Sequence, residues 1–96
     1  MAGRKGKIVA GVATVSTAGT AVQISSTDYR ASGITIKAAR ANVDAIYVGD
    51  SNVDNSTGKL FSDQSITFEF GPSHDISAIY ADADTNGNKV EWWVIV

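Results

Sequence analysis

DAIYVGDSNVDNSTGKLFSDQSITFEF (Asp44–Phe70) contains two strongly patterned segments on either side of a polar stretch. In Ser65–Phe70, polar and apolar side chains alternate strictly, which is the period-two pattern of a half-buried strand. Ala45–Val48 is apolar at every position, as expected for a central strand that is covered on both faces. The residues between them are rich in Asp, Asn and Ser, which favour turns. This stretch therefore predicts an all-β fold.

The rest of the chain continues the same pattern. Gly71-Pro72 predicts a break after the 65–70 strand, and Asn86-Gly87 predicts a tight hairpin turn. We therefore expect about seven antiparallel strands in a sandwich or small barrel, with jelly-roll or immunoglobulin-like topology. Besides the two segments above, the expected strands are Ile8–Val15, Thr20–Ile24, Ile34–Ala39, Ile76–Ala81 and Val90–Val96.

Composition narrows the class of protein. A chain of 96 residues is the size of one domain, and we expect residues 8–96 to form it, after a flexible basic arm at residues 1–7. No apolar run approaches the roughly 18 residues of a membrane span. The net charge of −2 argues against an electrostatic nucleic-acid binder. Cysteine is absent, which excludes disulfides and zinc–thiolate sites.

The N-terminal arm concentrates positive charge. Arg4, Lys5 and Lys7 precede the first expected strand, whereas every acidic residue lies at Asp28 or beyond. The arm is interpreted either as a solvated chain end or as a tether to an acidic neighbour.

The last expected strand, VEWWVIV, is apolar on both faces. Such a pattern fits a central strand that is buried on both sides. Alternatively, its second face, which carries Trp93 and Ile95, contacts another chain, because an uncovered apolar face favours association.

One loop resembles part of a metal-binding motif. Asp82, Asp84 and Asn86, followed by Gly87, match the opening of an EF-hand calcium loop, but Trp93 stands where the bidentate glutamate belongs. The alternative is a hairpin turn in which these side chains bond to backbone groups. No other cofactor is expected.

No catalytic constellation is visible in the sequence. The single histidine lies in Ser73-His74-Asp75, and neighbouring residues of a strand point to opposite faces, so these three side chains do not converge as a hydrolase triad requires. We therefore expect a protein that is not an enzyme.

Five segments follow one another along the chain in this order: TVSTAGTAVQISS, ITIKA, IYVGDSNVDNSTGKL, SITFEF and ISAIYADADTNGNKVEWWVIV. This order resembles small β-rich structural proteins of tailed bacteriophages. The resemblance implies a virion component, in particular a capsid decoration (cement) protein. Such a protein binds the major capsid protein on the outer head surface, stabilises the capsid and is often a homotrimer.

On this hypothesis the partner-binding residues are the basic arm, the Trp93 and Ile95 face, and Tyr29 with Arg30 in the loop before the third strand. Two alternatives remain from the same sequence. One is a tail or head-fibre component, and the other is a carbohydrate- or cell-surface-binding β-sandwich, assisted by calcium at residues 82–86.

Overall fold

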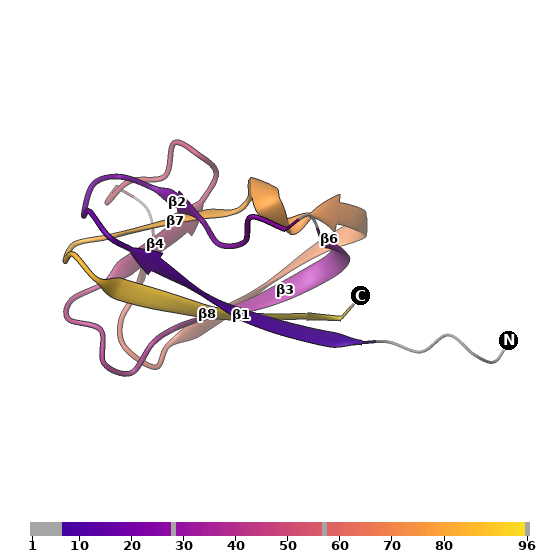
Figure 1. Ribbon diagram of the computed structural model, residues 1–96, viewed down its shortest axis with the longest axis horizontal. Helices are drawn as coiled ribbons and strands as arrows, with labels where there is room; N and C mark the ends of the chain where they lie inside the picture. Colours follow the sequence, from indigo (N-terminus) through magenta and orange to yellow (C-terminus); the bar gives the residue numbers. More distant parts are fainter. Residues whose placement is uncertain (1–6, 28, 57, 96) are drawn as a thin grey trace, which may run out of the picture.

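The protein is an all-β sandwich of two four-stranded antiparallel sheets (Figure 1). The computed structural model describes residues 7–27, 29–56 and 58–95. One sheet has the strand order β1-β8-β3-β6 and the other β2-β7-β4-β5. The strands are β1 (Ile8–Val15), β2 (Val22–Gln23), β3 (Arg30–Ala38), β4 (Ile46–Gly49), β5 (Lys59–Leu60), β6 (Ser65–Asp75), β7 (Tyr80–Ala83) and β8 (Asn88–Ile95), and a 3-10 turn, η1 (Ile76–Ala78), lies between β6 and β7.

The strand pairing identifies the topology. β1 pairs with β8, β2 with β7, β3 with β6, and β4 with β5. The chain is thus one long antiparallel hairpin, whose first four strands pair with its last four, rolled into two sheets. This is the jelly-roll arrangement. An immunoglobulin-like sandwich would instead place β2 beside β1.

The core lies between the two sheets and is almost entirely aliphatic. Inward-facing side chains alternate with outward-facing ones along β1, β3 and β8, as the period-two pattern predicts. Trp92 is the largest inward-facing side chain of β8, and its indole Nε1–H donates a hydrogen bond to the Ile24 carbonyl at 2.8 Å. The remaining fully buried aliphatic residues include Val15, Ile34, Ile36, Ile46, Ile76, Ala81 and Val90.

Some local predictions are wrong. The Asn86-Gly87 turn does not form a hairpin within one sheet, because β7 and β8 belong to different sheets. The predicted strand at 76–81 is divided, since residues 76–78 form η1 and the strand β7 begins only at Tyr80. In addition, the short strand β5 was not expected, because two residues carry no detectable period.

Gly71-Pro72 also does not end β6, which continues to Asp75. The pairing with β3 jumps from Gly33–Glu69 to Ala31–His74, so that residues 70–73 bulge opposite Ser32. Proline has no backbone N–H to donate and is tolerated in sheets at bulges and on edge strands. β6 is an edge strand, so both conditions hold here.

Within the described ranges, no helix has the length and apolar character needed to cross a membrane.

Candidate binding surface

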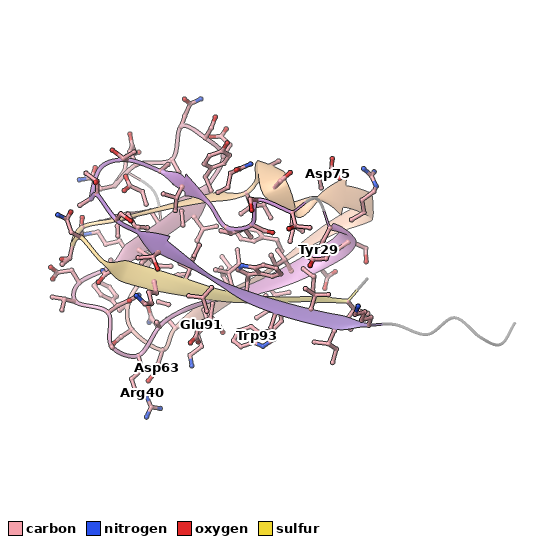
Figure 2. The ribbon with its side chains drawn as sticks, viewed as in Figure 1. Tyr29, Arg40, Asp63, Asp75, Glu91 and Trp93 are labelled. Carbon is pink, nitrogen blue, oxygen red and sulfur yellow. The ribbon has the colours of Figure 1, made fainter. Side chains whose placement is uncertain are left out.

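The solvent-facing side of the β1-β8-β3-β6 sheet, called the outer face below, carries exposed apolar side chains. Ile8 is 71% exposed, Val12 59%, Trp93 39% and Ile95 66%. All four occupy outward positions of the adjacent strands β1 and β8. We call these four residues the apolar patch. Figure 2 shows Trp93 projecting from the sheet on the side away from β2 and β7.

The register of the strands brings these residues together. Ile8 lies directly opposite Ile95, and Ala10 opposite Trp93. Residues directly opposite each other in antiparallel strands share one face, with Cβ atoms about 4.5–5.5 Å apart. On its other side Trp93 is opposite Thr35, whose hydroxyl lies 3.0 Å from that of Thr67 on β6. The outer face therefore changes from apolar at β1 to hydroxylated at β6.

A charged cluster borders the patch. Lys37 Nζ lies 3.7 Å from a Glu91 carboxylate oxygen and 3.4 Å from one of Asp63. Arg40 Nε donates to Asp63 Oδ2 at 3.0 Å. Partial desolvation raises the pKa of the Asp63 carboxyl, but the hydrogen bonds and positive charges of Arg40 and Lys37 outweigh it and hold this pKa below its usual value. In Figure 2, Glu91 projects on the same side as Trp93.

An open groove of about 680 Å³ lies beside the patch. Ile8, Ile95 and the Trp93 side chain line it together with Thr35, Thr67 and Glu69. An apolar centre with a polar border is the usual anatomy of a protein–protein interface. The arrangement suits binding, and its indole is the kind of anchor found at binding hot spots.

No protein-family model, curated protein or solved structure matches this chain.

The structure answers the question raised by the two-sided apolar pattern of the last strand. β8 has the expected central position in its sheet, between β1 and β3, but it is not buried on both sides. Its outward residues Trp93 and Ile95 are exposed to solvent. In the described part of the chain, only the inner face of this sheet is covered, so the second apolar face of β8 is exposed.

The other candidate contact residues lie elsewhere. Tyr29 is half-buried, and its ring packs against Trp92 with centroids 6.2 Å apart. Arg30 Nη1 forms a 2.9 Å ion pair with Asp75 across the β3–β6 pair. Neither is part of the apolar patch. Lys7 is exposed just before β1, whereas Arg4 and Lys5 lie outside the described residues.

Sequence reasoning did not single out Ile8 and Val12 as candidate contact residues. The signal was present, because Ile8–Val15 is apolar on both faces in the same way as the last strand. The two-sided apolar pattern of β1, like that of β8, indicates a strand whose outward side is apolar and uncovered.

The Asp-rich loop before β8 connects several parts of the fold. The buried carboxylate of Asp82 accepts hydrogen bonds from the backbone N–H groups of Gly19 and Ala83, at 2.9 and 2.8 Å. Asp84 accepts one from the Tyr47 hydroxyl at 2.7 Å, and Asn86 one from the Ala18 N–H at 2.7 Å. Asp82, Asp84 and Asn86, the residues proposed as calcium ligands, thus accept hydrogen bonds from different donor groups of the protein.

A calcium site requires six to eight converging oxygen ligands. Among the residues that the structure describes, no group of three or more His, Cys, Asp or Glu side chains is arranged to hold a metal ion. The hydrogen bonds of Asp82, Asp84 and Asn86 instead fasten the 82–87 loop to the β1–β2 turn and to β4.

The neighbouring Asp50–Asn55 segment shows the expected turn chemistry. Asp50 Oδ1 accepts the Asn52 N–H at 2.8 Å, and Asp54 Oδ1 accepts the Ser56 N–H at 2.9 Å. The hydrogen bonds from Ser56 lower the pKa of Asp54. These are local turns of the kind that Asp side chains favour.

Tyr47 gives this end of the sandwich a pH dependence. The hydrogen bond to Asp84, burial, and the charges of Asp84, Asp82 and Asp44 raise its pKa to about 12 from an ordinary 10.0. The protonated hydroxyl is therefore favoured by the fold. Its stabilisation is complete below pH 10, the value for the unfolded chain, and is lost as the pH rises to 12.

We predict that the wild-type protein loses about 1–2 kcal/mol more stability between pH 10 and pH 12 than Tyr47→Phe does. A two-unit pKa difference corresponds to roughly 3 kcal/mol, and the exposed position of Asp84 screens part of it. Urea unfolding of both proteins at pH 8, 10 and 12 measures the effect. Parallel losses in the two proteins would show that Tyr47 is not the titrating group.

Proposed function

We propose that this chain is a non-enzymatic structural protein of a bacteriophage virion, specifically a capsid decoration protein. It binds the major capsid protein on the outer surface of the head and stabilises the assembled shell. The observation that carries the proposal is the exposed apolar patch on the outer face of the sheet, bordered by the ion pairs of Lys37 with Asp63 and Glu91.

Two further points support the role. The order of the strand segments resembles small structural proteins of tailed phages, as described above. The jelly-roll strand order is also one that capsid and lectin domains use. That second point is an analogy of fold, and a fold by itself hosts many functions.

A protein that binds through such a patch stabilises a shell by adding contacts to it. A decoration protein that contacts several capsid subunits adds interfaces that must break before the shell expands or ruptures. It binds only the assembled lattice, so it stabilises that state by mass action. Several small contacts made by one oligomer raise the effective affinity well above that of each contact.

Charge contributes at the start of the chain. Lys7 is exposed next to Ile8, at the edge of the patch, and Arg4 and Lys5 precede it in the sequence. In this proposal the basic arm binds an acidic part of the capsid surface. In this proposal the protein acts as a homo-oligomer.

The experiment uses heads of the phage that encodes the chain, purified without this protein. We predict that the wild type binds these heads and raises their melting temperature, and that Trp93→Ala with Ile95→Ala weakens binding at least tenfold. Buried aromatic anchors commonly contribute 2 kcal/mol or more, equivalent to roughly 30-fold. Co-sedimentation with increasing protein gives the affinity.

Phe61→Ala is the matched control, because Phe61 is also an exposed aromatic, at 51%, but lies between β5 and β6 and not on the patch. It should bind heads like the wild type. Wild-type binding by the Trp93/Ile95 variant would remove the patch from the interface. Failure of the wild type to bind heads at all would reject the decoration role.

A second candidate function has one specific observation in its favour. The groove beside Trp93 combines an indole with the hydroxyls of Thr35 and Thr67 and the carboxylate of Glu69. Aromatic rings with nearby polar groups bind sugars, because the ring packs on the apolar face of the sugar while the polar groups hydrogen-bond its hydroxyls. Binding to host cell envelopes that soluble glycans compete away, with no binding to heads, would favour this carbohydrate-binding alternative.

A further inference from the structure

Among the residues that the structure describes, four strands have one edge with no partner strand: β1 and β6 in the first sheet, and β2 and β5 in the second. A free edge presents backbone N–H and C=O groups to any other strand, and proteins protect such edges with short strands, bulges, prolines or charges. β2 and β5 have only two residues each. β6 has the bulge at residues 70–73, which contains Pro72, and the outward charge of Glu69.

β1 has none of these protective features. Its eight residues, IVAGVATV, contain no charge and no proline. They pair with β8 in one unbroken register from Ile8–Ile95 to Val15–Asn88. A shallow groove of about 400 Å³ runs beside this strand, between residues 11–14 and 22–26. Among the edges that the structure describes, β1 is therefore the one suited to accept another strand.

We propose that β1 pairs antiparallel with β1 of a second copy about a twofold axis. The two four-stranded sheets then continue as one eight-stranded sheet across both protomers, in the manner of β-strand addition. This inference does not rest on the virion role, since it follows from the strand edge alone.

The pleat restricts the register of this pairing. Directly opposite residues share a face, so the outer faces of the two sheets match only when even-numbered residues oppose even-numbered ones. A twofold axis then passes beside one residue, which meets its own copy. At Gly11 that pair would bring no side chains together, whereas at Val12 it joins two β-branched side chains on the outer face. We therefore place Val12 opposite Val12 of the second copy.

A second copy fits this edge better than an unrelated strand does. Each residue of β1 occurs twice in such a pair, so a charge close to the twofold axis would lie near an identical charge, which is destabilising. The strand carries none. Pairing also joins the two apolar patches into one band, because Ile8 and Val12 of each copy lie on the same outer face. Twofold contacts of this self-complementary kind are the commonest in homo-oligomers.

The absence of cysteine from the chain permits a direct test with single-cysteine variants. Val12→Cys should form a covalent dimer in high yield under mild oxidation, because opposite Cβ atoms lie within reach of a disulfide. Thr14→Cys should not, because residue 14 opposes residue 10 of the other copy and the two cysteines lie about 14 Å apart. Thr67→Cys on β6 controls for random collision.

Light scattering provides a second measurement on the full chain. The wild type should have about twice the monomer mass of 10.0 kDa. Val12→Lys should raise the dimer dissociation constant at least tenfold, because two lysines would meet at the axis, and Thr67→Lys should leave the dimer unchanged. Circular dichroism confirms that both lysine variants are folded.

The proposal is overturned by a wild-type monomer at all concentrations, by a trimer whose mass is indifferent to Val12→Lys, or by equal crosslinking of Val12→Cys and Thr67→Cys. A dimer that passes these tests but does not bind phage heads would retain the β1 interface and reject the decoration role. The two proposals are thus separable.

Discussion

Replacing Trp92 with alanine should lower the free energy of unfolding by about 3–5 kcal/mol, the usual cost of deleting a buried large aromatic side chain. Trp92 is 4% exposed and lies in the core cluster between the sheets. Its ring contacts that of Tyr29, and its Nε1–H satisfies the Ile24 carbonyl. Small domains have a total stability of about 5–15 kcal/mol, so this variant loses a large part of it.

The neighbouring Trp93 is the control for this prediction. It has the same side chain on the same strand, but it points to the outer face and is 39% exposed. Trp93→Ala should therefore change stability by less than about 1 kcal/mol. Urea unfolding followed by far-ultraviolet circular dichroism compares the variants without relying on tryptophan fluorescence. Similar losses in the two variants would mean that the outer face is covered, contrary to its exposure here.

Trp92→Phe separates packing from hydrogen bonding. Phenylalanine keeps most of the aromatic surface but removes the Nε1–H, which leaves the Ile24 carbonyl without that donor. An unsatisfied buried carbonyl costs about 1–3 kcal/mol. The loss for Trp92→Phe should therefore be clearly smaller than the loss for Trp92→Ala.

Gly11→Ala is expected to be nearly as damaging, although it adds only one carbon. A Cβ at this position would lie 2.3 Å from Cζ2 of Trp92 and 2.6 Å from its Cε2. Gly11 and Trp92 are directly opposite in the β1–β8 pair, so the ring occupies the space that a side chain would need. Overpacking of this kind costs about 1–3 kcal/mol, occasionally more.

Two comparisons test this explanation. Gly58→Ala should have almost no effect, because an added Cβ there meets no atom within 4 Å. The double variant Gly11→Ala, Trp92→Phe should lose less stability than the sum of its single changes, because the smaller ring gives the new methyl group room. Additive losses would show that Gly11 is required for another reason. All proteins should be compared at one concentration, because self-association contributes to apparent stability.

The sequence predicted the fold class because side-chain alternation is a local property. Ser65–Phe70 was identified by its period-two alternation and Ile8–Val15 by its run of small, apolar and β-branched residues, and both begin as strands where expected. Turn chemistry was equally local: Gly87 has φ +88°, as the Asn-Gly pair predicts. The residues of a turn do not specify which sheet the next strand joins. That choice depends on pairing between distant residues, such as Ile8 with Ile95.

The same distinction explains which site residues were predicted. Trp93 and Ile95 were identified because a strand that is apolar on both faces must cover its second face or expose it. The position of Tyr29 could not be read in this way, since its contact with Trp92 joins residues far apart in the chain. The bulge of β6 likewise depends on β3 lying opposite, and the sequence shows only the Gly71-Pro72 pair.

The strand order also determines when this protein can fold during synthesis. The last two strands of the jelly roll, β7 and β8, occupy central positions in their sheets, between β2 and β4 and between β1 and β3 (Figure 1). A ribosome-bound chain that ends before residue 88 has made β1 and β3 but lacks the strand that joins them. Productive folding must therefore wait until translation has passed residue 95, and until then the uncharged first strand lacks its pairing partner, a condition that favours aggregation.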